Sequence, residues 1–439
     1  MTHAETRPAV PYLTTAMSGP LCELESHLLD RQHQIEGWFR AQWRHTPAPF
    51  YTSVDLRNSG FKLAPVDTNL FPAGFNNLNP VFEPLSMQAI QSAIERFCPD
   101  AIRVMIIPEG HTRNMFYLES LATLENLIDK AGFETRIAAL SLDTPVTHNL
   151  PSGRIVSVLP VTRKDDRLVA GDYDPCLIIL NNDMSSDSAG VLNGLSQIVT
   201  PPVDLGWAKR LKSGHFKVYR ELAKTFATMA EIDPWLVDPL FRNCGEINFV
   251  KREGEDCLAD NVQALLATIQ KKYKEYQIDT KPFVIVKADA GTYGMAVMTV
   301  ESPDDIRSLN RKQRVKMSTT KGGVEVRRVI MQEGVHTYET WGETEAVAEP
   351  VVYMIDRFVV GGFYRVHTRR GPNENLNAPG MHFEPLAFAE PCSNPDMPRD
   401  PDAAPNRFYA YGVVGRLAML AAAREIAATH NTPEKRQLN

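Results

Sequence analysis

The chain has 439 residues, 43% hydrophobic and 23% charged, which is enough for two or three domains or one large compound enzyme fold of ordinary globular composition. Its formal charge of -6, from 47 basic and 53 acidic residues spread along the chain, argues against nucleic acid and anionic lipid as partners. Six scattered cysteines without zinc-ligand spacing are too few for a disulfide scaffold and favour a reducing compartment. We find neither a signal sequence nor an apolar run long enough to span a membrane, and we expect a cytoplasmic protein.

The first half of the chain predicts an irregular terminus followed by alternating helices and strands. Residues 1–19 lack periodicity, and the apolar spacing over 20–45 predicts an amphipathic helix. Two strands are expected within 51–66, before a loop rich in Asn, Pro and Gly. Helices and strands then alternate as they do around a parallel sheet, with helices near 86–97 and 116–131 and strands near 102–107, 135–139, 154–160 and 175–180.

The second half predicts further helices and strands around a glycine loop. A long helix near 205–230 leads to a boundary near 240, and the rest begins with a short strand, INFVK, and a helix near 257–277. Ser302 as N-cap, with Pro303 after it and acids in the first turn, predicts a helix start. Apolar strands are expected in VRRVIMQEGV and EPVVYMIDRFVVGGFYRVH, followed by a Pro-rich segment at 371–408, a helix near 411–429 and a polar tail at 430–439.

The sharpest chemical signal is a lysine at the end of a strand beside a glycine loop. Lys287 ends the apolar strand FVIVK, Asp289 follows it, and the loop contains Gly291, Thr292, Tyr293 and Gly294. A lysine in this position can reach phosphate oxygens, while backbone N–H groups of the loop cover the phosphates. The loop is not a Walker A motif and strand follows it. We therefore expect a hairpin lid over ATP, with an ordinary tight hairpin as the alternative.

A second signal is an acid and an amide two residues apart on an expected strand. Asp67 and Asn69 would point to the same side, so that both oxygens could meet one hard cation such as Mg²⁺. The alternative is an Asx-type turn before Pro72. Nearby, Arg57 could hold a carboxylate through both arms of its guanidinium group, with a surface ion pair as the alternative.

A third set of polar residues lies late in the chain. Gln332 and Glu333 follow the strand VIM, where the strand edge could pair with an adenine and the acid could hold a ribose. Arg365, His367 and Arg369 are spaced by two and share one face of an extended strand. That positive charge suits an acyl phosphate or a carboxylate, and a solvated strand face is the alternative.

Taken in order, these segments resemble a known family. The Lys287 strand, the glycine loop, the SPDDI helix and the strands VIMQEGV and GGFYRVH resemble an ATP-grasp ligase. More closely, SVDLRNSGFKLAPVDTNLFPAGFNNL, FVIVKADAGTYGMAV and EPVVYMIDRFVVGGFYRVH resemble the proteobacterial glutamate–cysteine ligase family of the Acidithiobacillus type, over about residues 20–430. The fold implied is α/β (α+β) and similar to eukaryotic glutathione synthetase, with a parallel-sheet substrate region at 20–240 and antiparallel ATP-grasp lobes at 241–429.

The resemblance implies that ATP drives the joining of L-glutamate, through its γ-carboxylate, to L-cysteine by way of an acyl phosphate, which is the first step of glutathione synthesis. It implies Mg²⁺ at Asp67, Asn69 and Asp289, although Asp289 follows Lys287 at a shorter spacing than in the family pattern. We expect Lys287 and Lys251 to neutralise phosphate charge, and an arginine, Arg57 or Arg365, to meet the substrate and the tetrahedral intermediate.

Two alternatives to this function remain. Glutathione synthetase, or another carboxylate–amine ligase, would keep the fold and change the substrates. A nucleotide-binding regulatory protein with a decayed site belongs to another class, and the retained Lys287, Asp67 and Asn69 argue against it. All these functions need small-molecule partners, and ATP-grasp ligases are often homo-oligomers.

Overall fold

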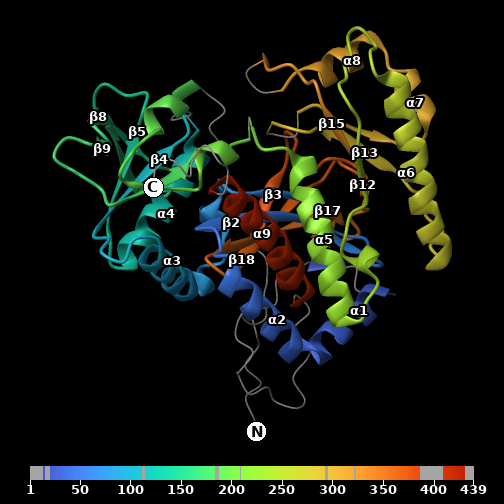
Figure 1. Cartoon of the computed structure of the whole chain (residues 1–439), viewed down its shortest axis with the longest axis horizontal. Helices are drawn as coiled ribbons and strands as arrows, with labels where there is room; N and C mark the ends of the chain where they lie inside the picture. The colour runs from blue at the N-terminus through green and yellow to red at the C-terminus, as the bar shows by residue number, and fades with distance from the viewer. Residues whose placement is uncertain are drawn as a thin grey trace.

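The computed structural model describes residues 13–14, 20–110, 114–182, 187–207, 209–291, 295–320, 323–385 and 409–430. A parallel-sheet region and a four-stranded lobe lie on either side of a central antiparallel sheet (Figure 1). The expected mixed α/β architecture is confirmed.

The parallel-sheet region has six strands in the order β11-β10-β4-β5-β7-β6, and every pair is parallel except β6 with β7. Its inner strands are apolar and buried, as strands covered on both faces must be. Asn114 starts α4 by accepting hydrogen bonds from the backbone N–H groups of Phe116 and Tyr117. The predicted alternation is confirmed by β4 (Arg103–Pro108), β5 (Glu134–Ala139), β7 (Ile155–Pro160), β10 (Leu177–Asn181), α3 (Glu83–Phe97) and α4 (Met115–Lys130). The sheet also contains β6 (Val146–Asn149) and β11 (Ile198–Thr200), for which no strand was predicted.

The central sheet joins strands from both halves of the chain. The hairpin expected within 51–66 is present as β2 (Tyr51–Asn58) and β3 (Leu63–Asn69), and β2 pairs antiparallel with β17, which places Asp55 opposite Val351. The chain enters the four-stranded lobe at β12, and the regions 20–240 and 241–429 both contribute strands to this central sheet. Its remaining strands are β1 (Leu13–Thr14), β16 (Thr340–Trp341), β17 (Ala346–Ile355), β18 (Phe358–His367) and β19 (His382–Pro385).

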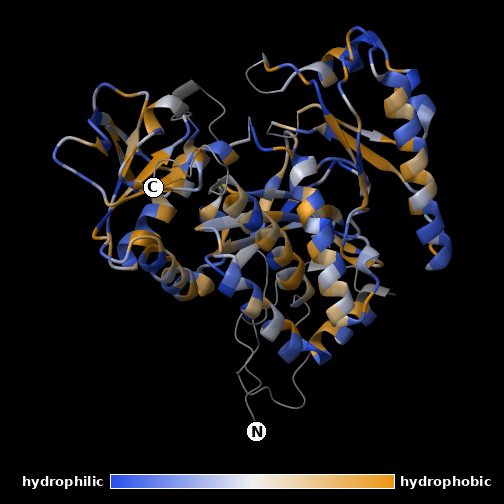
Figure 2. Cartoon of the chain, in the orientation of Figure 1, coloured by the Kyte–Doolittle hydropathy of each residue, from blue (hydrophilic) through white to orange (hydrophobic). Residues whose placement is uncertain are grey.

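Helices pack against the central sheet. The C-terminal helix α9 (Tyr409–His430) is buried over its first fifteen residues, and it packs on α5 (Lys212–Ala230) and on β2, β3 and β17. A helix apolar on all sides belongs in the interior, and Figure 2 shows its apolar residues at the centre of the molecule. The helix expected over 20–45 is two helices, α1 (Pro20–Asp30) and α2 (Gln32–His45). The helix expected from 205 begins at Lys212, after a short 3-10 turn at Val203–Leu205.

The four-stranded lobe is an antiparallel sheet in the order β12-β15-β13-β14, with its long helix packed on one side. The predicted helix start at Ser302 is present, and Ser302 and Asp305 form a capping box for α7. The predicted strand INFVK is wrong. Ile247 and Phe249 are buried in the core, but they lie in the loop after β12 and not in a strand. The edge strand of this sheet is β12, which lies earlier in the chain. The elements are β12 (Phe241–Asn243), α6 (Glu255–Glu275), β13 (Val284–Ala288), β14 (Val297–Val300), α7 (Pro303–Arg307), α8 (Arg311–Ser318) and β15 (Val329–Glu333).

The terminal predictions fall mostly outside the described residues. Within 1–19 only Leu13–Thr14 is described, and it pairs with β16, so the expectation of an irregular segment is wrong at this point. The tail beyond His430 lies outside the described residues, as does most of the Pro-rich segment 371–408. None of the described helices combines the length and apolarity needed to cross a bilayer.

Candidate active site

Lys287 connects the four-stranded lobe to the central sheet. It lies on β13, and its Nζ donates a hydrogen bond to the Val66 carbonyl oxygen on β3 at 2.6 Å. Burial lowers the pKa of Lys287, and the nearby carboxylates of Asp67 and Asp55 oppose that shift. The predicted lysine therefore lies in a low-dielectric position between two sheets, where its charge interacts strongly with any anion that reaches it.

Two carboxylates lie beside this lysine on neighbouring strands. Asp55 on β2 is directly opposite Asp67 on β3, and residues so paired share one face of a sheet. Burial would raise the pKa of Asp67, but the charges of Lys212, Lys287 and Arg210 lower it below its ordinary value. Burial raises the pKa of Asp55, and the like charges of Glu349 and Asp67 add to that effect. Asp55 was not among the predicted site residues, although it directly precedes the predicted LRNSGF segment.

Lys212 is a second cation that the sequence analysis missed. It is the first residue of α5, its Nζ donates to the Gly291 carbonyl oxygen at 2.7 Å, and it lies 4.3 Å from the centre of the Trp207 ring. Burial lowers the pKa of Lys212 to about 8. The N–H of Gly291 in turn donates to the Trp207 carbonyl oxygen at 2.9 Å. The start of the glycine loop is therefore attached to the segment before α5, while Thr292, Tyr293 and Gly294 lie outside the described residues.

The predicted metal ligands Asn69 and Asp289 make contacts within the protein. Asn69 Oδ1 accepts from the backbone N–H of Phe71 at 2.8 Å and from Trp207 Nε1 at 3.2 Å, which is the Asx-type alternative. The two Asp289 oxygens accept from the Ser213 N–H and hydroxyl, each at 2.7 Å, and so cap the N-terminus of α5. Across the described part of the chain, no three His, Cys, Asp or Glu side chains are grouped as a metal centre would need.

The two predicted arginines share one buried acid. Glu349 lies opposite Arg365 in the β17–β18 pair, and Arg365 contacts both Glu349 and Asp55, the latter at 3.0 Å. Arg57 Nε donates to Glu349 at 3.2 Å, and another arm of Arg57 donates to the Glu374 carbonyl oxygen at 2.5 Å. Burial would lower the pKa of Arg365, yet Asp55 and Glu349 raise it above its ordinary value. Arg57 and Arg365 are thus brought together around Glu349, in a network rather than on a solvated face.

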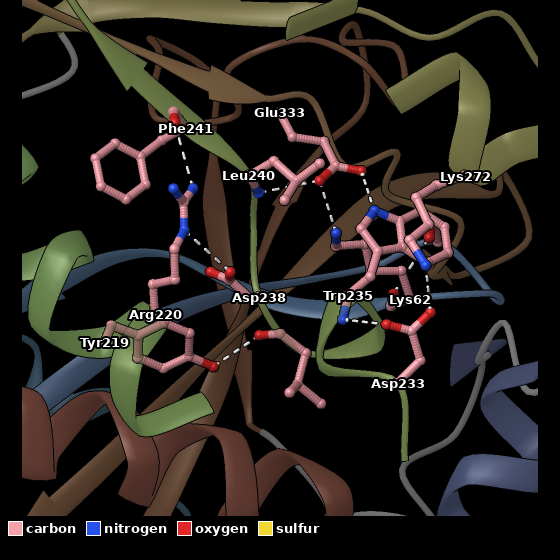
Figure 3. Close-up of polar contacts among 12 residues, drawn as sticks. Lys62, Tyr219, Arg220, Asp233, Trp235, Asp238, Leu240, Phe241, Lys272 and Glu333 are labelled. Carbon is pink, nitrogen blue, oxygen red and sulfur yellow. Dashed lines mark hydrogen bonds and ion pairs between the residues drawn. The ribbon is translucent and has the colours of Figure 1, made fainter. Parts of the chain in front are cut away.

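The predicted nucleotide residues Gln332 and Glu333 face opposite ways. Gln332 lies opposite Ile285, two residues from Lys287 on the same face of the sheet, and its Nε2 has no hydrogen-bond partner among the described residues. Glu333 accepts from Lys62 Nζ at 2.7 Å and from Trp235 Nε1 and the Leu240 N–H at 3.0 Å each (Figure 3). In this arrangement Glu333, at the end of β15, links the four-stranded lobe to the β2–β3 turn of the central sheet through Lys62.

The predicted phosphate residue Lys251 lies apart from these groups. It is exposed on the loop between β12 and α6. The cations whose charges act on Asp67 are Lys212, Lys287 and Arg210. Lys212 is therefore a further cation beside Lys287, and the phosphate-binding role expected of Lys251 stays a prediction. No sequence signal connects Lys212 to the glycine loop, because the contact is made only when α5 packs beneath the four-stranded lobe.

A cleft of about 580 Å³ runs along β14, which is paired to the Lys287 strand. Its other wall is the segment after β18, and Thr299 on β14 donates to the Asn373 carbonyl oxygen at 3.2 Å. A volume of this size accommodates a small ligand. Its polar lining includes Thr299, Asp305, Lys316, Arg370, Glu374 and Asn377.

An antiparallel lobe with a buried lysine faces a second antiparallel sheet beside a parallel-sheet region, which agrees with the mixed α/β architecture expected for a ligase of the family that the sequence resembles. The chain belongs to the GshA glutamate-cysteine ligase family, whose model matches residues 25–426. A crystal structure of a candidate gamma-glutamylcysteine synthetase from Methylobacillus flagellatus KT is 57% identical, covers 96% of this chain and 99% of that chain, and superposes with a TM-score of 0.87. The predicted family and enzyme class are confirmed.

More distant similarities add little. A glutathione synthetase-like effector from Globodera pallida is 11% identical, covers 78% of each chain and has a TM-score of 0.37, and D-cycloserine synthetase DcsG is 10% identical with a TM-score of 0.37 over 74% of this chain and 82% of that chain. Both values are too low to support an argument. Comparison with curated proteins found no match.

Proposed function

We propose that this protein is an ATP-dependent glutamate–cysteine ligase that joins the γ-carboxylate of L-glutamate to the amine of L-cysteine and releases ADP and phosphate. Membership of the glutamate-cysteine ligase family along residues 25–426 carries this proposal. The site is consistent with it, because Lys287, Lys212 and two arginines surround carboxylates on the central sheet. No side chain of the site needs to act as a nucleophile in this reaction.

Lys287 and Lys212 supply the fixed positive charge that phosphoryl transfer requires. Both amines are buried, and burial lowers the pKa of each. A phosphate near them would favour their charged forms, because an opposite charge reverses the effect of burial. Catalysis of this kind rests on positioning and electrostatic stabilisation.

The residues present fit Mg²⁺ at one position. Protein sites hold Mg²⁺ through one or two carboxylates together with phosphate oxygens. Asp67 and Asp55 share a face beside Lys287, so we assign the metal to this pair. Asp55 would exchange its contact with Arg365 for the ion, and Asn69 and Asp289 would likewise have to leave their present partners to join it. When bound, the ion would offset charge on the phosphates.

Arg57 and Arg365 are our candidates for recognising the substrate. The buried Nε of Arg365 has no hydrogen-bond partner within the described residues, and an arginine of this kind suits a carboxylate or an acyl phosphate. Glutamate's γ-carboxylate would be phosphorylated, and cysteine's amine would then displace phosphate through a tetrahedral intermediate that one of these guanidinium groups stabilises. The glycine loop would exclude water, since hydrolysis would waste the acyl phosphate.

A coupled ADP-release assay with ATP and Mg²⁺ tests the function. We expect turnover with glutamate and cysteine together and little with either alone. Turnover with γ-glutamylcysteine plus glycine instead would identify a glutathione synthetase and overturn the proposal.

Substitution of the site tests the residue assignments. Lys287→Ala and Asp67→Ala should each reduce kcat/KM by at least about a hundredfold, which corresponds to roughly 2.7 kcal/mol, with an unchanged circular dichroism spectrum. Lys281→Ala is the matched control, because Lys281 is exposed in the same lobe and pairs with Glu301. Near wild-type activity of either site variant would show that the assignment is wrong.

A further inference from the structure

Two cysteines of the four-stranded lobe face each other at short range. Cys244 directly follows β12, Cys257 lies in the first turn of α6, and their Sγ atoms are 2.7 Å apart. This separation is only about 0.7 Å longer than a disulfide bond of about 2.05 Å. Cys244 is 9% exposed and Cys257 is an exposed residue, so we expect a small molecule to reach Cys257 more readily than Cys244.

We propose that Cys244 and Cys257 are a reversible dithiol–disulfide site that a low-molecular-weight disulfide oxidises. This site is separate from the ATP and substrate residues described above, and it does not depend on the proposed ligase activity.

The division of roles between the two sulfurs follows from their exposure. The Cys257 thiolate attacks the small disulfide, whose S–S bond breaks and releases one thiolate, leaving a mixed disulfide on Cys257. The Cys244 thiolate then attacks the Cys257 sulfur, forms the protein disulfide and expels the second small thiolate. The two protons lost by the protein end on the two released thiols, so atoms and electrons balance.

Proximity is what allows the second step. Burial and the neighbouring Cys257 raise the pKa of Cys244 to about 12, so this thiol is a weak nucleophile towards molecules in solution. Held beside Cys257, it reacts at a high effective concentration. The pair should therefore oxidise as a unit, whereas Cys244 alone should resist oxidation.

Backbone hydrogen bonds hold the segment between the two cysteines. The Ile247 N–H donates to the Arg327 carbonyl oxygen at 2.9 Å, and Asn248 and Glu253 exchange backbone hydrogen bonds of 3.0 and 3.1 Å. Gly254 ends the loop at a φ of 78°, where a Cβ would lie 2.7 Å from the Glu246 carbonyl oxygen. Closing the disulfide requires the two Sγ atoms, now 2.7 Å apart, to approach by about 0.7 Å. The bond would enclose the loop that carries Lys251.

The test is peptide mapping of the whole protein after oxidation by glutathione disulfide. Acid quenching and alkylation should be followed by trypsin, which separates the cysteines into peptides 243–251 and 253–271. We expect these peptides to appear joined, to separate on reduction with dithiothreitol, and to account for the loss of two alkylatable thiols.

Single substitutions identify each sulfur's role. Cys257→Ser should leave Cys244 free of any glutathione adduct, whereas Cys244→Ser, or Cys244→Ala if serine disturbs folding, should stop at an adduct on Cys257. Cys98 and Cys176 provide an internal comparison, because their thiols also interact, and Cys98→Ser should not alter the 243–251 link. A wild-type protein that accumulates the Cys257 adduct without the linked peptide, or that links Cys257 to another cysteine, would overturn the proposal.

Discussion

Lys212 shows how burial gives an ordinary residue a pH-dependent function. Its pKa of about 8 means that the amine is charged below that pH and increasingly neutral above it. If Lys212 attracts phosphate, affinity for a non-hydrolysable ATP analogue should fall about tenfold between pH 7 and pH 9. Lys212→Arg should largely remove this fall, because arginine stays charged. Calorimetric titration with the analogue at pH 7 and at pH 9 measures this change in affinity. An equal fall in affinity in Lys212→Arg would exclude Lys212 as the cause.

Gly334 illustrates a glycine required by close packing. A Cβ at this position would lie 2.2 Å from two carbons of the Phe283 ring, at the point where the chain leaves β15. Gly334→Ala should therefore lower the free energy of unfolding by about 1–3 kcal/mol or more. In α2, a Cβ at Gly37 would contact only the end of the Arg40 side chain, at 4.0 Å. Gly37→Ala should therefore raise the free energy of unfolding by about 0.5–1 kcal/mol. Urea denaturation measures the free energy of unfolding of both variants. An unchanged value for Gly334→Ala would mean that the Phe283 ring can move away.

At the scale of elements, a buried ion pair joins the two ends of the chain. Arg416 on α9 makes two 2.7 Å hydrogen bonds to Glu36 on α2. Arg416→Met should cost about 3–5 kcal/mol, since it leaves a buried carboxylate unpaired, whereas the double variant with Glu36→Leu should recover most of that loss. Guanidinium denaturation of both variants tests this pair. Equal losses in the single and double variants would show that packing, and not charge, dominates.

Prediction from sequence succeeded where structure is local. The SPDDI helix start, the β13 strand ending in Lys287 and the β2–β3 hairpin follow from caps and periodicity over a few residues. It failed where a contact joins distant segments, as in the pairing of β2 with β17 and the capping of α5 by Asp289. Lys212 belongs to this second group. The strand β12 was missed because three residues are too few to show a period.

At the scale of the whole molecule, one buried pair fixes the four-stranded lobe to the central sheet. Lys62, in the turn between β2 and β3, holds Glu333 at the end of β15, and both side chains are 1% exposed (Figure 3). Lys62→Met should loosen this junction, because Glu333 keeps its burial and loses its cation. Amide hydrogen exchange within 241–333 should accelerate more than exchange within the parallel sheet. Uniform acceleration across both would indicate global destabilisation instead.

The shared central sheet also constrains how the protein can fold during synthesis. The parallel-sheet region is contiguous in sequence from α3 to β11, so it can fold while translation continues. The hairpin β2–β3 emerges earlier but finds its partner strand β17, and the helix α9 that covers it, only near the end of the chain. Such distant pairing slows folding, and it leaves β2 without its partner strand β17 during most of translation. The last-made helix is therefore the one that completes the core.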